Sequence, residues 1–317
     1  MQEVITYNPR DKDRLLEGEK SLVSVVIPSR NHIKKLQKAI ESVTRQTYNN
    51  YEVIVVDDAS SDGTSSWVKT RYPDIQLIRL SRQGGAAKAR NEALKIAKGK
   101  FIAFLDSDDE WVPEYLQFQI TALLHTPASA LSFCEILNVE TDGSQRKIIY
   151  VPKPGYPTLV HRLLAESSFI LTMSAVVVRA DAFKKIGFLD EKLRITHDRE
   201  LYIRLLQLNS NITYIPETLI VKHCHGSNIS SDFYSWAKDA MLLLDIFFSN
   251  KKNQQYKQAE TAARREIIIG LFNYISNSNL GPLSKSQSAL TLCIYLLRFG
   301  KYVKGDIYNL LAKKKSR

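Results

Sequence analysis

The chain has 317 residues, of which 44% are hydrophobic and 24% are charged, values typical of a soluble globular protein with a large core. The first twenty residues are too charged for a signal peptide, and no later stretch reaches the roughly 18 uninterrupted apolar residues of a membrane span. Three widely spaced cysteines indicate neither a disulfide framework nor a metal site, which favours a reducing cytoplasm. Lysine and arginine exceed aspartate and glutamate by 44 to 33, so we expect an anionic partner. On charge alone, that partner is a nucleotide diphosphate, an acidic lipid or a nucleic acid.

The first third of the chain alternates β-branched runs with helical periodicity. Strands are predicted at residues 22–27, 51–56, 76–80 and 101–105, and helices at 33–43, 65–72 and 86–97. We expect Pro28 to stop the first strand, and the pair Gly84 and Gly85 to form a hinge before the third helix. This alternation predicts an α/β fold with a mostly parallel sheet and right-handed crossovers.

Carboxylates follow two of these strands at the point where each strand ends. Asp57 and Asp58 follow the second, and Asp106, Asp108 and Asp109 follow the fourth. Ligands of open α/β sheets bind beyond the carboxyl ends of the strands, so we expect these acids along one edge. If the fourth strand continues, Asp106 and Asp108 point the same way and could share a magnesium or manganese ion with a substrate phosphate. The alternative is an acidic turn in which Asp109 or the next residue caps the following helix.

The second part of the chain leaves the parallel order. Helices are predicted at 113–125 and 158–166, strands at 129–136 and 172–179, and a hairpin turn at Asp142 and Gly143. Another helix begins near Asp198, and two short strands flank Pro216. From Trp236 onward the sequence predicts long helices, which places a boundary near residue 232. We therefore divide the chain into a polar lead-in at 1–20, a catalytic domain at 21–232 and a helical C-terminal region at 233–317.

The last helical segment combines apolar and basic character. Residues 289–299 are strongly apolar, and a lysine- and arginine-rich tail runs from there to Arg317. This combination is typical of a segment that lies on an anionic membrane surface. A helix packed on the body with a solvated basic tail explains the same pattern.

Four stretches, taken together, resemble the motifs of the inverting glycosyltransferases of family 2, which have the GT-A fold. They are VSVVIPSRN, YEVIVVDDASSDGT, ARNEAL with AKGKFIAFLDSDD, and IGFLDEKLRITHDRELYIRL. The resemblance covers about residues 20 to 230, and Arg30 stands where the family has an aromatic residue. It implies a GT-A-type nucleotide-binding sheet flanked by helices, with a helical C-terminal appendage.

The resemblance also implies roles for individual residues at the donor. Asp58 is expected to hold the nucleotide base, and Asp106 and Asp108 to form the aspartate-x-aspartate (DXD) element with a divalent cation, manganese or magnesium. A carboxylate can accept hydrogen bonds from the N–H groups of uracil or guanine, and a cation neutralises charge as the sugar leaves. The expected donor-binding residues are Pro28, Asn31, Asp58, Arg90, Asp106 and Ser107, and the expected metal ligands are Asp106, Asp108 and His225. For Arg90, helix packing or surface solvation is the competing explanation, and for His225 it is a solvent-facing loop.

Asp198 matches the catalytic acid of the family, and His197 stands where the family usually has a glutamate. We expect Asp198 to act as the general base that takes the proton from the acceptor hydroxyl. The first turn of a helix tends to keep a carboxylate ionised, which suits that role. The alternative is a structural acid at a helix N-terminus.

The expected activity is metal-dependent transfer of one sugar, with inversion, from a nucleotide diphosphate sugar to a hydroxyl of a saccharide. UDP is the expected nucleotide, and the expected setting is capsule, O-antigen or another cell-surface polysaccharide. We expect a cytoplasmic protein that is peripheral at the inner face of the cell membrane. The expected acceptor is a saccharide, either free or lipid-linked, and we expect no nucleic-acid partner. The alternatives are a nucleotidyltransferase, for which PSRNHIKK lacks the phosphate-loop glycines, and a non-catalytic nucleotide-sugar binding module.

Overall fold

The computed structural model describes residues 3–9, 21–151, 153, 155–166, 169–170, 172–208, 211–224, 232–277 and 282–299. The chain forms two compact units. The first comprises Met1–Gly155 with Ser168–Gly226, and the second comprises Tyr156–Ser167 with Ser227–Arg317. The second unit therefore takes in residues 156–167, which the sequence analysis assigned to the catalytic domain.

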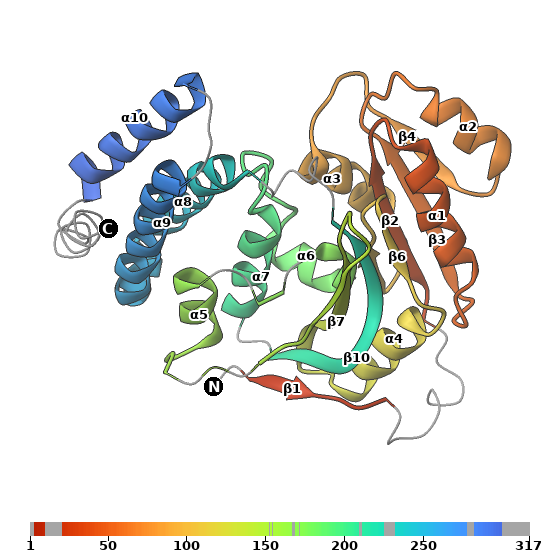
Figure 1. Ribbon diagram of the computed structural model, residues 1–317. Helices are drawn as coiled ribbons and strands as arrows, with labels where there is room; N and C mark the ends of the chain where they lie inside the picture. The colour runs from red at the N-terminus through yellow and green to blue at the C-terminus, as the bar shows by residue number, and fades with distance from the viewer. Residues whose placement is uncertain are drawn as a thin grey trace. The chain divides into compact units, whose positions relative to one another are not determined.

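A single mixed sheet organises the first unit (Figure 1). Its strand order is β1-β10-β7-β9-β5-β2-β3-β4, with β6 paired to β10 and β8 paired to β7. Neighbours in the β5-β2-β3-β4 half are parallel, and β9 is antiparallel to both β5 and β7. The strands are β1 (Val4–Thr6), β2 (Val23–Ser29), β3 (Tyr51–Asp57), β4 (Gln76–Arg79), β5 (Phe101–Phe104), β6 (Asp109–Trp111), β7 (Ser129–Val139), β8 (Gln145–Ile148), β9 (Val176–Arg179) and β10 (Asn211–His223). The predicted mostly parallel α/β sheet is confirmed.

Helices cover both faces of this sheet (Figure 1). They are α1 (Ile33–Thr44), α2 (Thr64–Arg71), α3 (Ala86–Ile96), α4 (Tyr115–His125), α6 (Ala180–Ile186) and α7 (His197–Gln207). In α1, apolar residues at helical spacing are fully buried and join α4 in one core with alternate residues of β2 and β5. This core holds β2 and β5 side by side, and the acidic residue Asp106 follows directly after β5.

Three expectations about the strands are wrong. Pro28 does not stop the first strand, because β2 continues to Ser29 and pairs with β3 there. Its missing N–H is tolerated because β5 pairs with β2 only as far as Val26. The lead-in is not all loosely held, since Val4–Thr6 pair with β10 as an edge strand. The predicted strands around Pro216 are one strand, β10, with a register shift between Ile215 and Thr218.

The second unit is helical and contains a buried arginine that is paired with two carboxylates. It contains α5 (Leu159–Ala165), α8 (Phe233–Ser249), α9 (Lys257–Asn277) and α10 (Pro282–Phe299). Buried Arg264 of α9 donates to Glu260 at 2.9 Å and to Asp245 of α8 at 2.8 Å, so its charge is paired at both ends.

The helix α10 has a packed side and an exposed side. Leu292 is buried, whereas Ile294 is 51% exposed, and Arg298 donates to Asp245 at 3.1 Å. The basic tail beyond Phe299 lies outside the described residues. None of the helices in the described ranges is both long enough and apolar enough to cross a membrane.

Candidate active site

The loops that follow β2, β3 and β5 meet at one edge of the sheet. Ser29 is in register with Asp57, and Val26 is in register with Phe104, so these parallel strands end side by side. The predicted gathering of acidic loops at this edge is therefore what the topology produces.

Asn31 connects the first two of these loops. Its backbone has the left-handed conformation, with φ of 55°, which asparagine tolerates better than most residues. Its side-chain oxygen accepts from the Ser61 backbone N–H at 2.8 Å, and its own N–H donates to Ser60 Oγ at 2.9 Å. Asn31 therefore ties the loop after β2 to the loop after β3, and it does not cap α1, because His32 stands at the N-cap of that helix.

Asp58 is buried, and its carboxylate is occupied by backbone amides. The two oxygens accept from Gly84 N–H at 2.6 Å and from Gly85 N–H at 2.9 Å. The predicted hinge at these glycines is thus held by two charge-assisted hydrogen bonds. The Asp57 carboxylate is also engaged nearby: it accepts from the Ser60 N–H at 2.9 Å and from the hydroxyl of Ser65 on α2.

The chain does not continue as a strand after β5, because the acidic cluster forms a turn. The Asp109 backbone N–H donates to the Asp106 carbonyl at 3.0 Å, and β6 then pairs antiparallel with β10. The prediction that Asp106 and Asp108 point the same way required the strand to continue through them, and it does not. Of the alternative, the acidic turn is present, but neither Asp109 nor Glu110 caps the next helix, since α4 begins at Tyr115 without a side-chain cap.

Asp109 carries the largest electrostatic strain of the turn. It is 1% exposed and accepts from Ser174 Oγ at 2.6 Å, and its other oxygen, Oδ1, has no hydrogen-bond partner among the described residues. Burial raises the pKa of Asp109 to about 7; Lys222, its register partner on β10, opposes the shift, while Asp106 and Asp108 add to it. Desolvation is therefore the largest cost of an ionised carboxylate at this position.

A buried arginine joins this turn to the helix α7. Arg90 on α3 is 3% exposed, forms an ion pair with Asp106 through Nη2, and contacts His197 Nε2 through Nη1 at 2.7 Å. Because arginine can only donate, His197 Nε2 must be the unprotonated ring nitrogen. Burial alone would raise the pKa of Asp106, but Arg90, followed by Lys222, holds it below its usual value. Arg90 is therefore part of the site, and surface solvation does not explain it.

Asp198 follows His197 in the first turn of α7. Burial raises the pKa of Asp198 to about 6 and the charge of Asp106 adds to the shift, against the Arg199 backbone N–H and the charge of Arg90. Desolvation outweighs the field of the helix N-terminus at this carboxylate. A carboxylate with a pKa near 6 is ionised at neutral pH and is a stronger base than an exposed aspartate.

The sequence analysis missed three residues that support the turn. Thr172 Oγ1 lies 3.4 Å from oxygens of both Asp106 and Asp109, and Ser174 Oγ accepts from the Asp106 N–H at 3.0 Å. Lys222 supplies the nearby positive charge. No local signal marks any of the three, since each lies far from the turn in sequence.

The remaining predicted site residues are less informative. Ser107 is buried within the turn, between Asp106 and Asp108. His225 lies outside the described residues, so its predicted role as a metal ligand stays a prediction.

The residues present fit a cation near the turn, although they do not form a ready-made site. Within the described ranges, no group of three or more His, Cys, Asp or Glu side chains is arranged to hold a metal ion. The Oδ1 atom of Asp109, which has no hydrogen-bond partner among the described residues, nevertheless offers a divalent cation a carboxylate ligand. Carboxylate oxygens are the ligands that magnesium and manganese prefer.

Comparison with known proteins gives consistent results. The sequence model described as Glycosyl transferase family 2 matches residues 24–187. The putative teichuronic acid biosynthesis glycosyltransferase TuaG of Bacillus subtilis is 37% identical over 225 residues, which cover 69% of this chain and 85% of that protein. Escherichia coli WfgD, a UDP-Glc:alpha-D-GlcNAc-diphosphoundecaprenol beta-1,3-glucosyltransferase, is 48% identical over 105 residues, 32% of this chain and 41% of its own.

Two solved structures share the fold. Staphylococcus aureus TarS 1-349, in complex with UDP-GlcNAc, superposes with a TM-score of 0.62 at 18% identity, over 89% of this chain and 80% of that one. The Pyrobaculum calidifontis mannosyltransferase PcManGT, in complex with GDP-Man and Mn²⁺, gives 0.57 at 17% identity, over 93% and 89%. At these identities the likeness concerns the fold alone.

Proposed function

The chain belongs to glycosyltransferase family 2, and on that premise we propose that it transfers one sugar from a UDP-sugar to a hydroxyl of a saccharide acceptor, with inversion at the anomeric carbon. The observation that carries the proposal is the chain of contacts from Asp106 through Arg90 to His197, next to Asp198. It joins the acidic turn on the donor side to the residue proposed as base. Such pre-organisation is what a displacement with two separate reacting groups requires.

Asp198 is the proposed general base. It takes the proton of the acceptor hydroxyl as the oxygen bonds to the anomeric carbon, and the bond from that carbon to the nucleoside diphosphate breaks on the opposite face. The raised pKa of Asp198, about 6, supports this role because proton transfer is most effective when the pKa of the base lies near the working pH.

We propose that Asp58, Pro28 and Asn31 form the nucleotide side of the donor site. Asn31 and Pro28 are supported by their position at the shared edge of β2 and β3. Asp58 already binds Gly84 and Gly85, so its proposed contact with a base requires a free lone pair on one of its oxygens. A UDP donor is supported by the UDP-Glc in the name of WfgD and the UDP-GlcNAc bound to TarS.

We propose that Asp106 and Asp108 hold a divalent cation with the donor diphosphate, and the Mn²⁺ in PcManGT supports this choice of ion. The cation would neutralise charge on the departing diphosphate. Arg90 contributes a second, permanent positive charge at the same turn, and it limits how Asp106 can turn toward a ligand.

The setting of the reaction is proposed on the relatives. The names of TuaG and WfgD support cell-surface polysaccharide synthesis, and WfgD supports a lipid-linked acceptor. We also retain the predicted cytoplasmic location, and the contact of residues 289–317 with an anionic membrane, as proposals; the exposed Ile294 supports the latter.

The test is release of free nucleoside diphosphate from a panel of nucleotide sugars, with and without saccharide acceptors and Mn²⁺. Acceptor-dependent release of UDP by the wild type, lost in Asp198→Asn, would support the proposal. Release of pyrophosphate instead would indicate nucleotidyl transfer. Donor binding without any turnover across the panel would indicate a binding module.

A further inference from the structure

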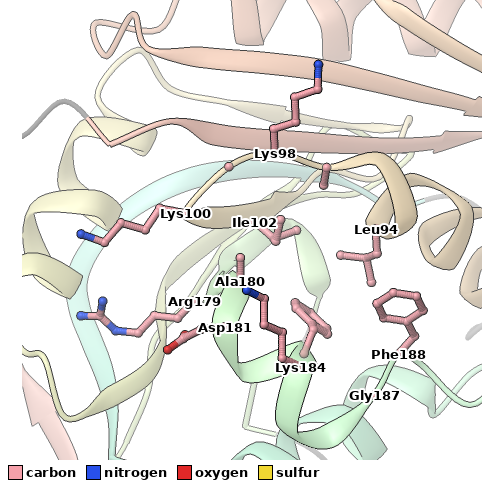
Figure 2. Close-up of a pocket in the computed structure, with 13 residues that line it drawn as sticks. Leu94, Lys98, Lys100, Ile102, Arg179, Ala180, Asp181, Lys184, Gly187 and Phe188 are labelled. Carbon is pink, nitrogen blue, oxygen red and sulfur yellow. The ribbon is translucent and has the colours of Figure 1, made fainter.

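A second cavity lies in the first unit, away from the acidic turn. It has a volume of about 770 Å³, and its walls come from the end of α3, the start of β5, the junction of β9 with α6, and the loop after α6 (Figure 2). Lys100 precedes β5 and Asp106 follows it, so the cavity and the acidic turn lie at opposite ends of one strand. At about 3.3 Å per residue, these ends are roughly 15 Å apart or more. The cavity is therefore separate from the candidate active site.

One side of this cavity is cationic. Four of its lining side chains are basic, namely Lys98, Lys100, Arg179 and Lys184, and one is acidic, Asp181. Figure 2 shows Lys100 and Arg179 extending from the same side, with Lys184 rising from α6 between them and the apolar wall. Within the described part of the chain, no ion pair joins any of the three lysines to a carboxylate.

Arg179 is the half-buried member of this group, and its guanidinium carbon lies over the Phe101 ring, 5.4 Å from the ring centroid. Its Nε donates to the Ser129 carbonyl at 2.9 Å and its Nη2 to the Leu123 carbonyl, which fixes the guanidinium in place. Burial lowers the pKa of Arg179, and the charge of Asp181 only partly opposes the shift. An anion bound at this side would relieve the cost of the buried charge.

The opposite side is apolar. Leu94, Ile102, Phe183 and Phe188 line it, and Figure 2 shows Leu94 and Phe188 together, across the cavity from Arg179. Phe188 is 39% exposed at the mouth, and its ring lies 6.4 Å from that of buried Phe183. An exposed aromatic side chain in contact with a buried one offers an apolar ligand a continuous surface.

The two sides together specify a ligand chemistry. A bare anion would gain nothing from the apolar wall, and an uncharged apolar ligand would bring no counter-charge to Lys100, Arg179 and Lys184. We propose that this cavity binds an amphiphile with a phosphate group joined to an apolar chain. Its phosphate lies toward Lys100, Arg179 and Lys184, and its chain lies against Phe188 and Leu94. The volume is that of an ordinary small-molecule pocket.

Calorimetric titration of the full-length protein with octyl phosphate, inorganic phosphate and octanol tests the combination. We expect octyl phosphate to bind about tenfold or more tightly than either of the others, because only octyl phosphate satisfies both walls. Absence of octyl phosphate binding, or equal affinity for inorganic phosphate, would overturn the proposal.

Three variants locate the binding. Lys100→Glu/Lys184→Glu should weaken octyl phosphate about tenfold or more, since both side chains are exposed and their replacement leaves the core intact. Phe188→Ser should weaken octyl phosphate and leave the affinity for inorganic phosphate unchanged. The matched control Lys38→Glu/Lys69→Glu makes the same change of charge at exposed positions of α1 and α2. An equal loss of octyl phosphate affinity in the control, or no loss of that affinity in the cavity variants, would contradict the assignment.

Vesicles identify the source of the amphiphile. Sedimentation with phosphatidylglycerol vesicles, but not with phosphatidylcholine vesicles, that is lost in Lys100→Glu/Lys184→Glu would assign a membrane lipid. If octyl phosphate binds and no vesicle sediments the protein, the cavity takes a soluble phosphorylated amphiphile.

Discussion

The carboxylates after β3 and those after β5 stand at the same edge of one sheet, yet they are compensated in different ways. Asp57 and Asp58 accept from hydroxyl and backbone N–H groups of nearby loops, at sequence separations of 3 to 27 residues. Asp106 and Asp109 depend instead on charged side chains, Arg90 and Lys222, which come from a helix and a strand elsewhere in the fold. A backbone amide satisfies a carboxylate with a hydrogen bond and adds no net charge, whereas a charged side chain shifts the pKa of the carboxylate that it pairs with. The first pair therefore shapes the site, and the second region is equipped to change its charge state.

The largest effect is expected at the base next to this second region. Asp198→Asn should lower turnover at least roughly a hundredfold, because the proposed proton acceptor is lost. Donor affinity should change little. The melting temperature should be unchanged or higher, since burial disfavours the ionised form of Asp198 and asparagine removes that charge. Steady-state kinetics with calorimetry and thermal unfolding measure all three quantities, and Asp74→Asn is an exposed control. Near-normal turnover in a folded variant would remove Asp198 from the mechanism.

Replacing Arg90 tests whether the second region depends on side-chain charge. Arg90→Ala should cost about 2 kcal/mol of unfolding free energy, because it leaves the partly buried Asp106 without its ion partner. Turnover should fall about tenfold or more, since the link between the acidic turn and α7 is also lost. Denaturant unfolding and kinetics are the measurements, with exposed Arg71→Ala as the matched control. If Arg90→Ala and Arg71→Ala have the same stability and turnover, the contacts of Arg90 with Asp106 and His197 contribute to neither.

The pH profile sharpens the comparison without any mutation. Burial, reinforced by Asp106, raises the folded-state pKa of Asp198 to about 6, so its basic form accumulates as the pH rises through that value. Turnover should therefore rise about tenfold between pH 5 and pH 7. The same shift in pKa has the opposite effect on stability. Between about pH 4 and pH 6 the folded state holds a proton that the unfolded state has lost, so the contribution of Asp198 to the free energy of unfolding falls as the pH rises through that interval. A flat turnover profile over that interval would contradict the assignment of the base.

The smallest functional effect is expected in the first region. Asp57→Asn should lower the free energy of unfolding by about 1 to 2 kcal/mol, because it weakens the bonds to Ser60 and Ser65. Turnover of the folded variant should stay within about threefold of the wild type, since the partners of Asp57 are Ser60, Ser65 and Arg79 and none of them contacts Asp106 or Asp198. Thermal unfolding and kinetics on the same sample separate these effects. A large loss of turnover with unchanged stability would show that the division between the two regions is wrong.

The sequence alone determined the parallel core and the position of its acids. β-branched runs alternating with helical periodicity are local patterns, and the acids after Val56 and Leu105 follow directly from where those runs end. The antiparallel strand β9 and the turn at Asp106 were beyond such reasoning. They depend on which strand lies next to β5, and that is settled by packing across the whole sheet.

The electrostatics of the site were decided only by the tertiary structure. Arg90 meets Asp106 across 16 residues and His197 across 107, and Ser174 meets Asp109 across 65. No local pattern encodes such pairings, because they form only when the helices and strands have packed. The raised pKa of Asp198 has the same origin. The helix start that the sequence predicts favours an ionised carboxylate, but burial by the surrounding fold is the stronger influence.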